Sequence, residues 1–482
     1  MKISNALISS LVASLFVMAA MPVRAQDVSS EPTVLTLQQA LEIALSENIS
    51  IKVADKEIER TGYARKGSYA TLFPQIDGSG SYSRTIKKQV MYMDFDMSSF
   101  GGGMGGGAMG GDTEIPEGVE TKAGSKGGNG GGIEVGRWNS FSAGVSASMP
   151  LINAQVWQSI KLTAQDVELA VEKARSSRLE TVTQVKQAYY GVLLAKEAFE
   201  VYKKVYENAM ANLEKTEQRY NVGKASELEY VRSKSAVQNA IPNVYDSESS
   251  INLALWQLKA VMGISLDENI DVAGCLADHA GNMIHDVYAT DEISLEDNST
   301  MRQLAIQAEQ IANTIKLQQY ASLPSLAVAY AYNLNAMTND FDFKNYNWSP
   351  YSYVGLSLQI PIFAGGKRYH AVRQAQVQKA EFDLQRDNTE RQLKIAIRQY
   401  LKQMETGMKT YDSAQAAVET AQKAYDIAAQ SYNLGRSTIT DLNDAQLALT
   451  QAQLGMSQAV YNYVNAKANL EQTLGYDFSA NE

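Results

Sequence analysis

Apolar residues recur every three or four positions over long stretches of the chain, which is the pattern of helices that pack lengthwise against one another. In the second half, one such series covers residues 411–432, and after Gly435 another covers residues 442–470. The first half contains the counterpart of this last series at residues 230–261. Many of these positions are alanine, so the pattern predicts closely approaching helices, as a tube built from many helices requires.

Four short segments have a different pattern, in which apolar and polar residues alternate as in half-buried β-strands. In one of them, Phe141, Val145 and Met149 point to one face, and serines and glycine point to the other. The predicted strands are residues 75–84, 140–149, 325–332 and 353–360. Their lengths are close to the roughly 9–11 residues that a tilted membrane strand needs. Because one face is uniformly apolar, we favour membrane strands over a soluble β-sandwich on a coiled-coil stalk.

The two halves of the chain follow one plan, which indicates a duplication. Three pairs of short motifs share nearly the same offset: 149–152 (MPLI) with 360–363 (IPIF) at 211, 220–223 (YNVG) with 432–435 (YNLG) at 212, and 262–263 (MG) with 474–475 (LG) at 212. Each half therefore reads as an opening helix, two strands, a very long helix and a shorter return helix.

This plan gives the expected domain organisation. It consists of a signal peptide 1–25, a first repeat 26–263 (strands 75–84 and 140–149, long helix 153–222, return helix 225–262), an equatorial linker 264–294, a second repeat 295–475 (strands 325–332 and 353–360, long helix 367–434, return helix 437–474) and a tail 476–482. The long helix would extend about 110 Å at 1.5 Å per residue, and the return helix about half of that. We therefore expect the opening and return helices to stack end to end beside the long one.

The N-terminus predicts export from the cytoplasm. Lys2 precedes an apolar run at residues 6–20 and a small-x-small cleavage pattern that ends at Ala25, as in a secretory signal peptide. The single cysteine, Cys275, excludes an intramolecular disulfide and a cysteine-based metal cluster. The formal net charge of −10 argues against nucleic-acid binding. After residue 25 no apolar run reaches the roughly 18 residues of a spanning helix. A membrane-spanning part would therefore have to be a β-barrel.

Four strands are too few to close a barrel, because the smallest outer-membrane barrels have about eight. An open sheet in lipid would leave unpaired backbone groups at its edges, which is energetically costly. Several copies of the chain must therefore share one barrel, and three copies would supply twelve strands around an aqueous lumen.

Several motifs, in their order and duplication, resemble those of the TolC family of outer-membrane efflux and secretion channels. They are the opening-helix sequence 35–45 (LTLQQALEIAL), the strand-to-helix sequence 360–368 (IPIFAGGKR) and the two turns YNVG and YNLG. The resemblance covers nearly the whole mature chain. It implies a fold that is mainly α with a small β part: long coiled-coil hairpins in two tandem repeats, each giving two strands to a trimeric 12-stranded transmembrane β-barrel that continues into a 12-helix periplasmic α-barrel.

The function that the resemblance implies is that of a passive exit duct in a tripartite efflux or type I secretion system. The expected partners are two further copies in a homotrimer, a periplasmic adaptor (membrane fusion protein), an inner-membrane pump and outer-membrane lipid. The alternative is a periplasmic coiled-coil adaptor or scaffold that does not span the membrane, which would need no amphipathic strands. We predict no enzyme activity and no catalytic, cofactor-binding or metal-binding residues. The cargo is not predicted, since a lining of small and polar residues does not discriminate.

Gate residues can be carried over only from the resemblance. The family closes its tunnel at the periplasmic end by polar links between helices, with a ring of acidic residues nearby. Glu229 stands where the family can have an acidic link residue, Tyr432 at its tyrosine, and Asp441 and Asp444 at the acidic ring. Ser437 replaces a family arginine, which puts that link in question.

Asp441 and Asp444 are three residues apart, so they lie on one helical face. Threefold symmetry would gather six carboxylates around one opening, where their mutual repulsion would raise their pKa values and attract cations. The alternative is an ordinary solvated helix face.

The two YNxG turns are the predicted docking surface for the adaptor. Gly223 and Gly435 supply the backbone freedom that a turn requires. Lys224 and Arg436 follow them and are expected to contact the adaptor, although plain solubilising charge would explain them equally well. Arg436 is also the candidate to replace the arginine that is missing at Ser437.

A glycine-rich segment at about residues 87–136 reads as a long structureless loop. It holds several methionines: Met91, Met93, Met97, Met104 and Met109. Methionine clusters bind Cu(I), but these are irregularly spaced and have no neighbouring histidine or cysteine. We therefore favour a flexible extracellular loop, which leaves the barrel opposite the helices.

Overall fold

The computed structural model describes residues 32–91, 133–281, 294–342 and 346–476. The chain forms two compact units, and the two long helices contribute to both. Unit 1 contains Met1–Ile58, Ala170–Ala305 and Gln385–Glu482, and unit 2 contains Glu59–Leu169 and Ile306–Leu384. The predicted signal peptide 1–25, most of the loop 87–136 and all of the tail except Tyr476 lie outside the described residues.

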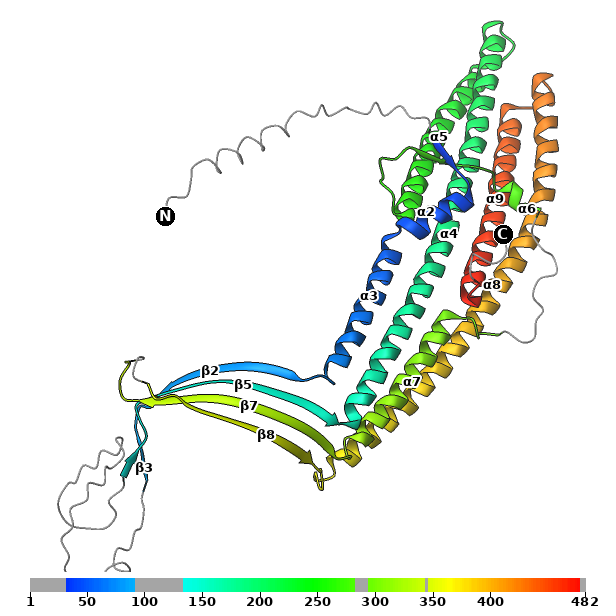
Figure 1. Cartoon of the computed structure of the whole chain (residues 1–482). Coiled ribbons are helices and arrows are strands. Elements are labelled where there is room, and N and C mark those ends of the chain that lie inside the picture. The colour runs from blue at the N-terminus through cyan, green and yellow to red at the C-terminus, as the bar shows by residue number, and fades with distance from the viewer. Residues whose placement is uncertain (1–31, 92–132, 282–293, 343–345, 477–482) are drawn as a thin grey trace, which may run out of the picture. The chain divides into compact units, whose positions relative to one another are not determined.

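The described part is mainly helical with a small β part, so the predicted fold class is confirmed (Figure 1). The helices are α2 (Leu37–Glu47), α3 (Ile49–Ala70), α4 (Ala154–Asn221), α5 (Glu227–Met262), α6 (Ala277–Ala280), α7 (Ser299–Tyr320), α8 (Lys367–Asn433) and α9 (Ile439–Leu474). The strands are β1 (Thr33–Leu35), β2 (Gln75–Arg84), β3 (Gln89–Met91), β4 (Ile133–Val135), β5 (Asn139–Ile152), β6 (Ile270–Val272), β7 (Ser325–Thr338) and β8 (Ser349–Gln359). None of the described helices is long and apolar enough to cross a membrane.

Unit 2 contains a four-stranded antiparallel sheet in the order β2-β5-β7-β8. The central pairing of β5 with β7 continues from Asn139 opposite Thr338 to Ile152 opposite Leu326. These strands are longer than the alternation alone predicted, because backbone pairing persists beyond the last regularly alternating residue. On β8, the apolar side chains of Val354 and Leu356 are 73% and 70% exposed.

The two ends of the segment that was predicted to be a structureless loop pair with each other as β-strands. Gln89–Met91 and Ile133–Val135 form the antiparallel ribbon β3–β4. This corrects the prediction for those six residues: the ladder hydrogen bonds between the two ends of the segment order its first and last residues. The methionines beyond Met91 lie outside the described residues.

Unit 1 shows how the opening and return helices meet. The opening helix of the first repeat, expected as one element, is divided into α2 and α3 at Asn48. The Asn48 side-chain amide donates to the carbonyl of Val261 at 2.6 Å, and its oxygen accepts from the backbone N–H of Ser50 at 2.7 Å. The same side chain thus starts α3 and satisfies a carbonyl in the last turn of α5.

The second repeat uses the same device. The Asn298 amide donates to the carbonyl of Thr473 at 2.6 Å, and its oxygen accepts from the backbone N–H of Met301 at 2.9 Å. Gly263 and Gly475 end α5 and α9 with a left-handed φ of 79°. The end-to-end arrangement expected from the helix lengths is therefore present in both repeats.

The main core of unit 1 surrounds the middle of α4. Val185, Tyr189 and Leu193 are buried there with side chains of α2, α5, α8 and α9. The linker 264–294 is hydrogen-bonded to this region, because the hydroxyl of Tyr189 donates to the carbonyl of Ala273 at 2.7 Å. Its β6 also pairs in parallel with β1. Burial raises the pKa of Tyr189 above its usual 10.0.

Replacing Gly263 by alanine is expected to destabilise the junction between α5 and α3. A Cβ at this position would lie 2.7 Å from the carbonyl oxygen of Glu47, and the left-handed backbone is itself unfavourable for alanine. We expect a loss of about 2 kcal/mol or more, seen as a lower unfolding temperature by circular dichroism in detergent. Gly62→Ala, in the open interior of α3, is the control and should be neutral or stabilising. Equal unfolding temperatures for the two variants would contradict the close approach.

Candidate functional site at the two hairpin turns

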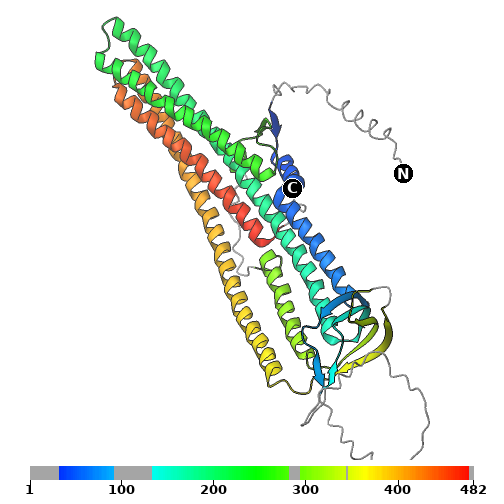
Figure 2. The ribbon, with the colours of Figure 1, turned by 90° about the vertical axis from the view of Figure 1, so that its left-hand side faces the viewer.

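The two YNxG sequences form the turns of the α4–α5 and α8–α9 hairpins, which end close together in unit 1 (Figure 2). Gly223 and Gly435 have left-handed φ values of 74° and 72°. The residue after each glycine donates its backbone N–H to the carbonyl five positions earlier: Lys224 to Arg219 at 2.7 Å, and Arg436 to Ser431 at 2.8 Å. The duplicated sequence therefore builds the same turn twice.

Each return helix begins with a capping box. The backbone N–H of Ser226 donates to the Glu229 carboxylate at 3.1 Å, and the N–H of Glu229 donates to the Ser226 hydroxyl at 3.2 Å. Thr438 and Asp441 make the corresponding pair on α9, at 2.8 Å and 3.2 Å. Two of the predicted gate acids, Glu229 and Asp441, thus occupy equivalent positions and start their helices.

The Asp441 carboxylate is held in its charged form. Hydrogen bonds from the backbone N–H and the hydroxyl of Thr438 lower its pKa below the usual 3.8. This is opposite to the shift expected from repulsion among neighbouring copies. Asp444 lies one turn further along α9, and both side chains are exposed. Their role as an acidic ring stays a prediction.

Tyr432 is the centre of a buried polar contact between the hairpins. Its side chain is 2% exposed, and its hydroxyl lies 2.6 Å from the hydroxyl of Thr216 on α4. Thr216 donates to the carbonyl of Asn212, so it accepts from Tyr432. Ser233 on α5 lies 3.2 Å from the same Thr216 oxygen. Within the chain, Tyr432 is therefore bonded to Thr216, while the Glu229 carboxylate is used by its own helix cap.

Arg219 provides the positive charge beside Tyr432. Its Nη1 donates to the carbonyl of Tyr432 at 3.1 Å, and its guanidinium lies 5.3 Å from the centre of the tyrosine ring. A cation at the C-terminal end of α8 is favoured by the helix dipole. Arg436 is the predicted substitute for the arginine that is missing at Ser437, and its side chain is exposed. The Ser437 hydroxyl donates to the carbonyl of Ala428 in its own hairpin at 3.4 Å.

Further polar contacts join the hairpins near their turns. Arg232 donates to the hydroxyl of Thr440 at 3.1 Å, and the Asn208 amide donates to Gln446 at 2.9 Å. Like the contacts of Tyr432, these pair neutral groups with each other or a cation with a neutral oxygen. For the contact of Ser233 with Thr216 the sequence carried one signal, since Ser233 occupies a seam position in the apolar series of α5.

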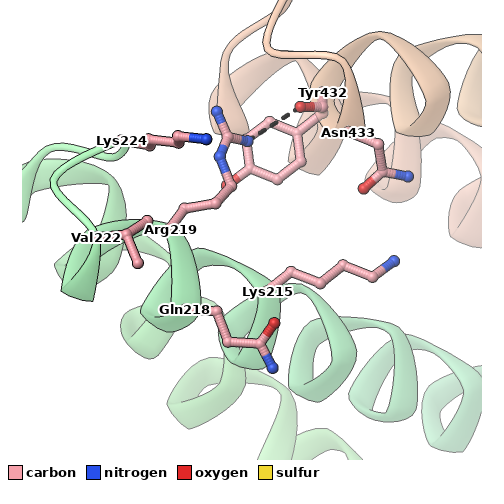
Figure 3. A pocket seen from close by; sticks show the side chains of 7 residues that line it. All are labelled: Lys215, Gln218, Arg219, Val222, Lys224, Tyr432 and Asn433. Carbon is pink, nitrogen blue, oxygen red and sulfur yellow. Dashed lines mark hydrogen bonds between the residues drawn. The ribbon is translucent and has the colours of Figure 1, made fainter.

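A pocket of about 340 Å³ opens between the ends of α4 and α8 (Figure 3). Its lining comes from both hairpins: Lys215, Gln218, Arg219, Val222, Lys224, Tyr432 and Asn433. The predicted docking residue Lys224 and the predicted gate residue Tyr432 thus lie at one site, to which Lys215 and Arg219 add two cations. Gly223, Gly435 and Arg436 are not part of this lining.

No group of three or more metal-ligating side chains is found in residues 32–91, 133–281, 294–342 and 346–476. The arrangement is therefore one of positive charge and hydrogen-bond donors around an opening between two helical hairpins, with a buried hydroxyl contact beneath it.

The comparison with protein families identifies the class of protein to which this chain belongs. The family model described as outer membrane efflux protein matches residues 40–264 and 292–476. The chain belongs to the outer membrane efflux protein family. This family consists of transport channels and is not a class of enzymes. The resemblance to the TolC family and the outer-membrane localisation predicted from the sequence are confirmed.

Curated relatives are distant. The outer membrane protein TolC of Vibrio cholerae is 22% identical over 238 residues, which are 49% of this chain and 54% of that protein. The alkaline protease secretion protein AprF of Pseudomonas aeruginosa is 22% identical over 251 residues, or 51% of this chain and 52% of the relative. The chain thus spans about half the length of these two relatives.

The fold itself is shared over a larger part of the molecule. The crystal structure of the CmeC outer membrane channel of Campylobacter jejuni matches with a TM-score of 0.67 at 19% identity, covering 91% of this chain and 85% of that one. At this level of identity, the similarity establishes the architecture.

Proposed function

We propose that three copies of this chain form an outer-membrane channel that serves as the passive exit duct of a tripartite efflux or type I secretion system. The observation that carries the proposal is the open sheet of unit 2. In the described part of the chain, β2 and β8 each pair on one side only. Val354, Leu356 and Leu358 of β8 are exposed by more than half, which suits lipid contact.

The sheet topology supports a shared barrel. The four strands alternate in direction, so β8 of one copy can pair antiparallel with β2 of the next around a closed ring. Two copies would make eight strands, whose interior is filled by side chains. Three copies make twelve, which leaves room for a solute path. Closure also satisfies the edge hydrogen bonds that lipid cannot.

The hairpin turns are the proposed gate and docking end of this duct. Tyr432 lies between the hairpins, where a small separation of α8 from α4 would break its bond to Thr216. Asp441 and Asp444 are proposed to attract cations near the opening. Gly223, Lys224, Gly435 and Arg436 are proposed to meet a periplasmic adaptor, which connects the duct to an inner-membrane pump.

The test is conductance in planar lipid bilayers with detergent-extracted protein. Discrete, cation-preferring single-channel steps are the expected result. A protein that is soluble without detergent and never inserts would overturn the proposal and favour a periplasmic scaffold. Cross-linking of the detergent-extracted protein would report the number of copies, for which three is expected.

A further inference from the structure

The pocket at the hairpin turns concentrates positive charge. Lys215 and Arg219 come from the last turns of α4, and Lys224 from the turn itself, while Tyr432 and Asn433 line the side formed by α8 (Figure 3). No carboxylate is part of the lining. This is unusual for a chain with a formal net charge of −10, in which acidic residues outnumber basic ones.

The three cations are available to a ligand. Lys215 and Lys224 are exposed, and neither takes part in an ion pair within the described residues. Arg219 is partly buried and oriented by its bond to the carbonyl of Tyr432. A guanidinium held in place loses little freedom when it binds a second acceptor, and its planar array of N–H donors matches a carboxylate.

The internal duplication shows that the turn does not need this charge. At the offset of 212, Ile427 stands where Lys215 does, and Ser431 stands where Arg219 does. The second turn nevertheless has the same glycine conformation and the same closing hydrogen bond. Of the three cations, only Lys224 has a basic counterpart in the second turn, which is Arg436. Lys215 and Arg219 are therefore additions to the first hairpin, on top of what folding the turn requires.

We propose that this pocket receives a carboxylate side chain of the periplasmic adaptor, so that the first hairpin carries the ionic part of docking. The inference rests on the proposed function and adds the chemistry of the partner. Two ammonium groups and one guanidinium supply the charge, and the amide groups of Gln218 and Asn433 supply neutral hydrogen bonds. A pocket of about 340 Å³ has room for a carboxylate side chain of a partner.

Two acids near the turns are already used within the chain. Glu229 and Asp441, which lie in the first turns of the return helices, are both occupied in their capping boxes. Because opposite charges at an interface raise the rate and specificity of association, a cationic pocket beside the opening would also orient the adaptor on approach.

A zero-length carbodiimide cross-link in envelopes of the native host tests the contact, because it joins a lysine amine only to a carboxylate that touches it. The expected result is a cross-linked peptide that contains Lys215 or Lys224 together with an aspartate or glutamate of the adaptor. Joining to a carboxylate of a second copy would overturn the inference, as would an adaptor joined only through other residues. If no adaptor is cross-linked to any residue of this chain and no channel-dependent export is seen, the proposed function itself fails. Export is measured independently of the cross-link, so this failure can be distinguished from failure of the inference alone.

Charge reversal provides the functional test with a matched control. The double variant K215E/K224E is expected to lower channel-dependent export at least about tenfold, since like charges at an interface are strongly unfavourable. Lys204 is exposed and precedes Lys215 by three helical turns on the same face of α4, so K204E should export like the wild type. Changing the cross-linked adaptor acid to lysine should restore export in the double variant. Unchanged export in a correctly assembled K215E/K224E trimer, or an equal loss of export in K204E, would refute the proposed role of the pocket in docking.

Discussion

Replacing Thr216 by valine is expected to open the hairpin end of the channel. Valine keeps the shape of threonine but leaves the buried Tyr432 hydroxyl without the acceptor that lies 2.6 Å away. An unsatisfied buried hydroxyl costs about 1–3 kcal/mol, which corresponds to about 5- to 150-fold in an equilibrium between closed and open ends. The measurement is single-channel conductance in planar bilayers, where a larger mean conductance or a greater open fraction is expected.

Two further variants make this prediction specific. Tyr432→Phe should have a smaller effect than Thr216→Val, because Ser233 remains 3.2 Å from the Thr216 oxygen and can bond to it. Tyr220→Phe is the control, since Tyr220 is the counterpart of Tyr432 in the first repeat, is 39% exposed and stacks on Tyr230. An equal change in conductance for Tyr432→Phe and Tyr220→Phe would show that the buried hydroxyl contact does not hold the end closed.

The contribution of Arg219 is expected to be different in kind. Its guanidinium acts on the carbonyl and ring of Tyr432, so an Arg219→Gln variant should weaken both the closed end and the charged pocket. Within the described residues, the side-chain hydrogen bonds and the cation–π contact of Tyr432 are with Thr216 and Arg219, and neither Lys215 nor Lys224 takes part in them. The two roles are therefore separated by testing the Thr216→Val variant for the closed end and the K215E/K224E double variant for docking.

Periodic features of the chain made the architecture predictable. The long helices expected at 153–222 and 367–434 are found at Ala154–Asn221 and Lys367–Asn433. Seam residues repeat every few positions, so each turn of the helix adds to the signal, and glycine marks where it ends. The duplication supplied a second, independent copy of every boundary. The division of the chain into two repeats and a linker stays a prediction, because the compact units combine parts of both halves.

Contacts between distant residues were not predictable in this way. Arg219 meets Tyr432 across 213 positions, and Asn48 meets Val261 across the same separation. An asparagine within a helical series looks like a weak helix residue, and only the packed structure shows that its amide reaches another helix. The resemblance pointed to Tyr432 but not to its partner, because Thr216 lies in the other hairpin. The sequence thus pointed to Tyr432, but not to Thr216, Arg219 or the contact of Asn48 with Val261.

The acidic pair of α9 is expected to determine ion preference. Replacing Asp441 and Asp444 together by asparagine should remove most of the cation preference of the channel and its block by multivalent cations, because these carboxylates are exposed at the start of α9, near the proposed opening. The measurement is the reversal potential in a salt gradient. The matched control is Asp412→Asn, an exposed acid of α8 about six helical turns before the turn residues. Unchanged selectivity in the double variant would leave the pair as an ordinary solvated helix face.

The pH dependence of that preference separates two causes. Capping by Thr438 lowers the pKa of Asp441, so its charge, and the stability that the cap contributes, are present above the usual 3.8 and are lost only as the pH falls through the lowered value. Mutual repulsion among six carboxylates would act in the opposite direction and neutralise the ring at a higher pH. We expect the preference to survive acidification to about pH 4, the ordinary range of a carboxyl group, because the cap binds each Asp441 within its own chain. Loss of the preference at pH 5 to 6, with the channel still assembled, would show instead that repulsion between copies dominates at the opening.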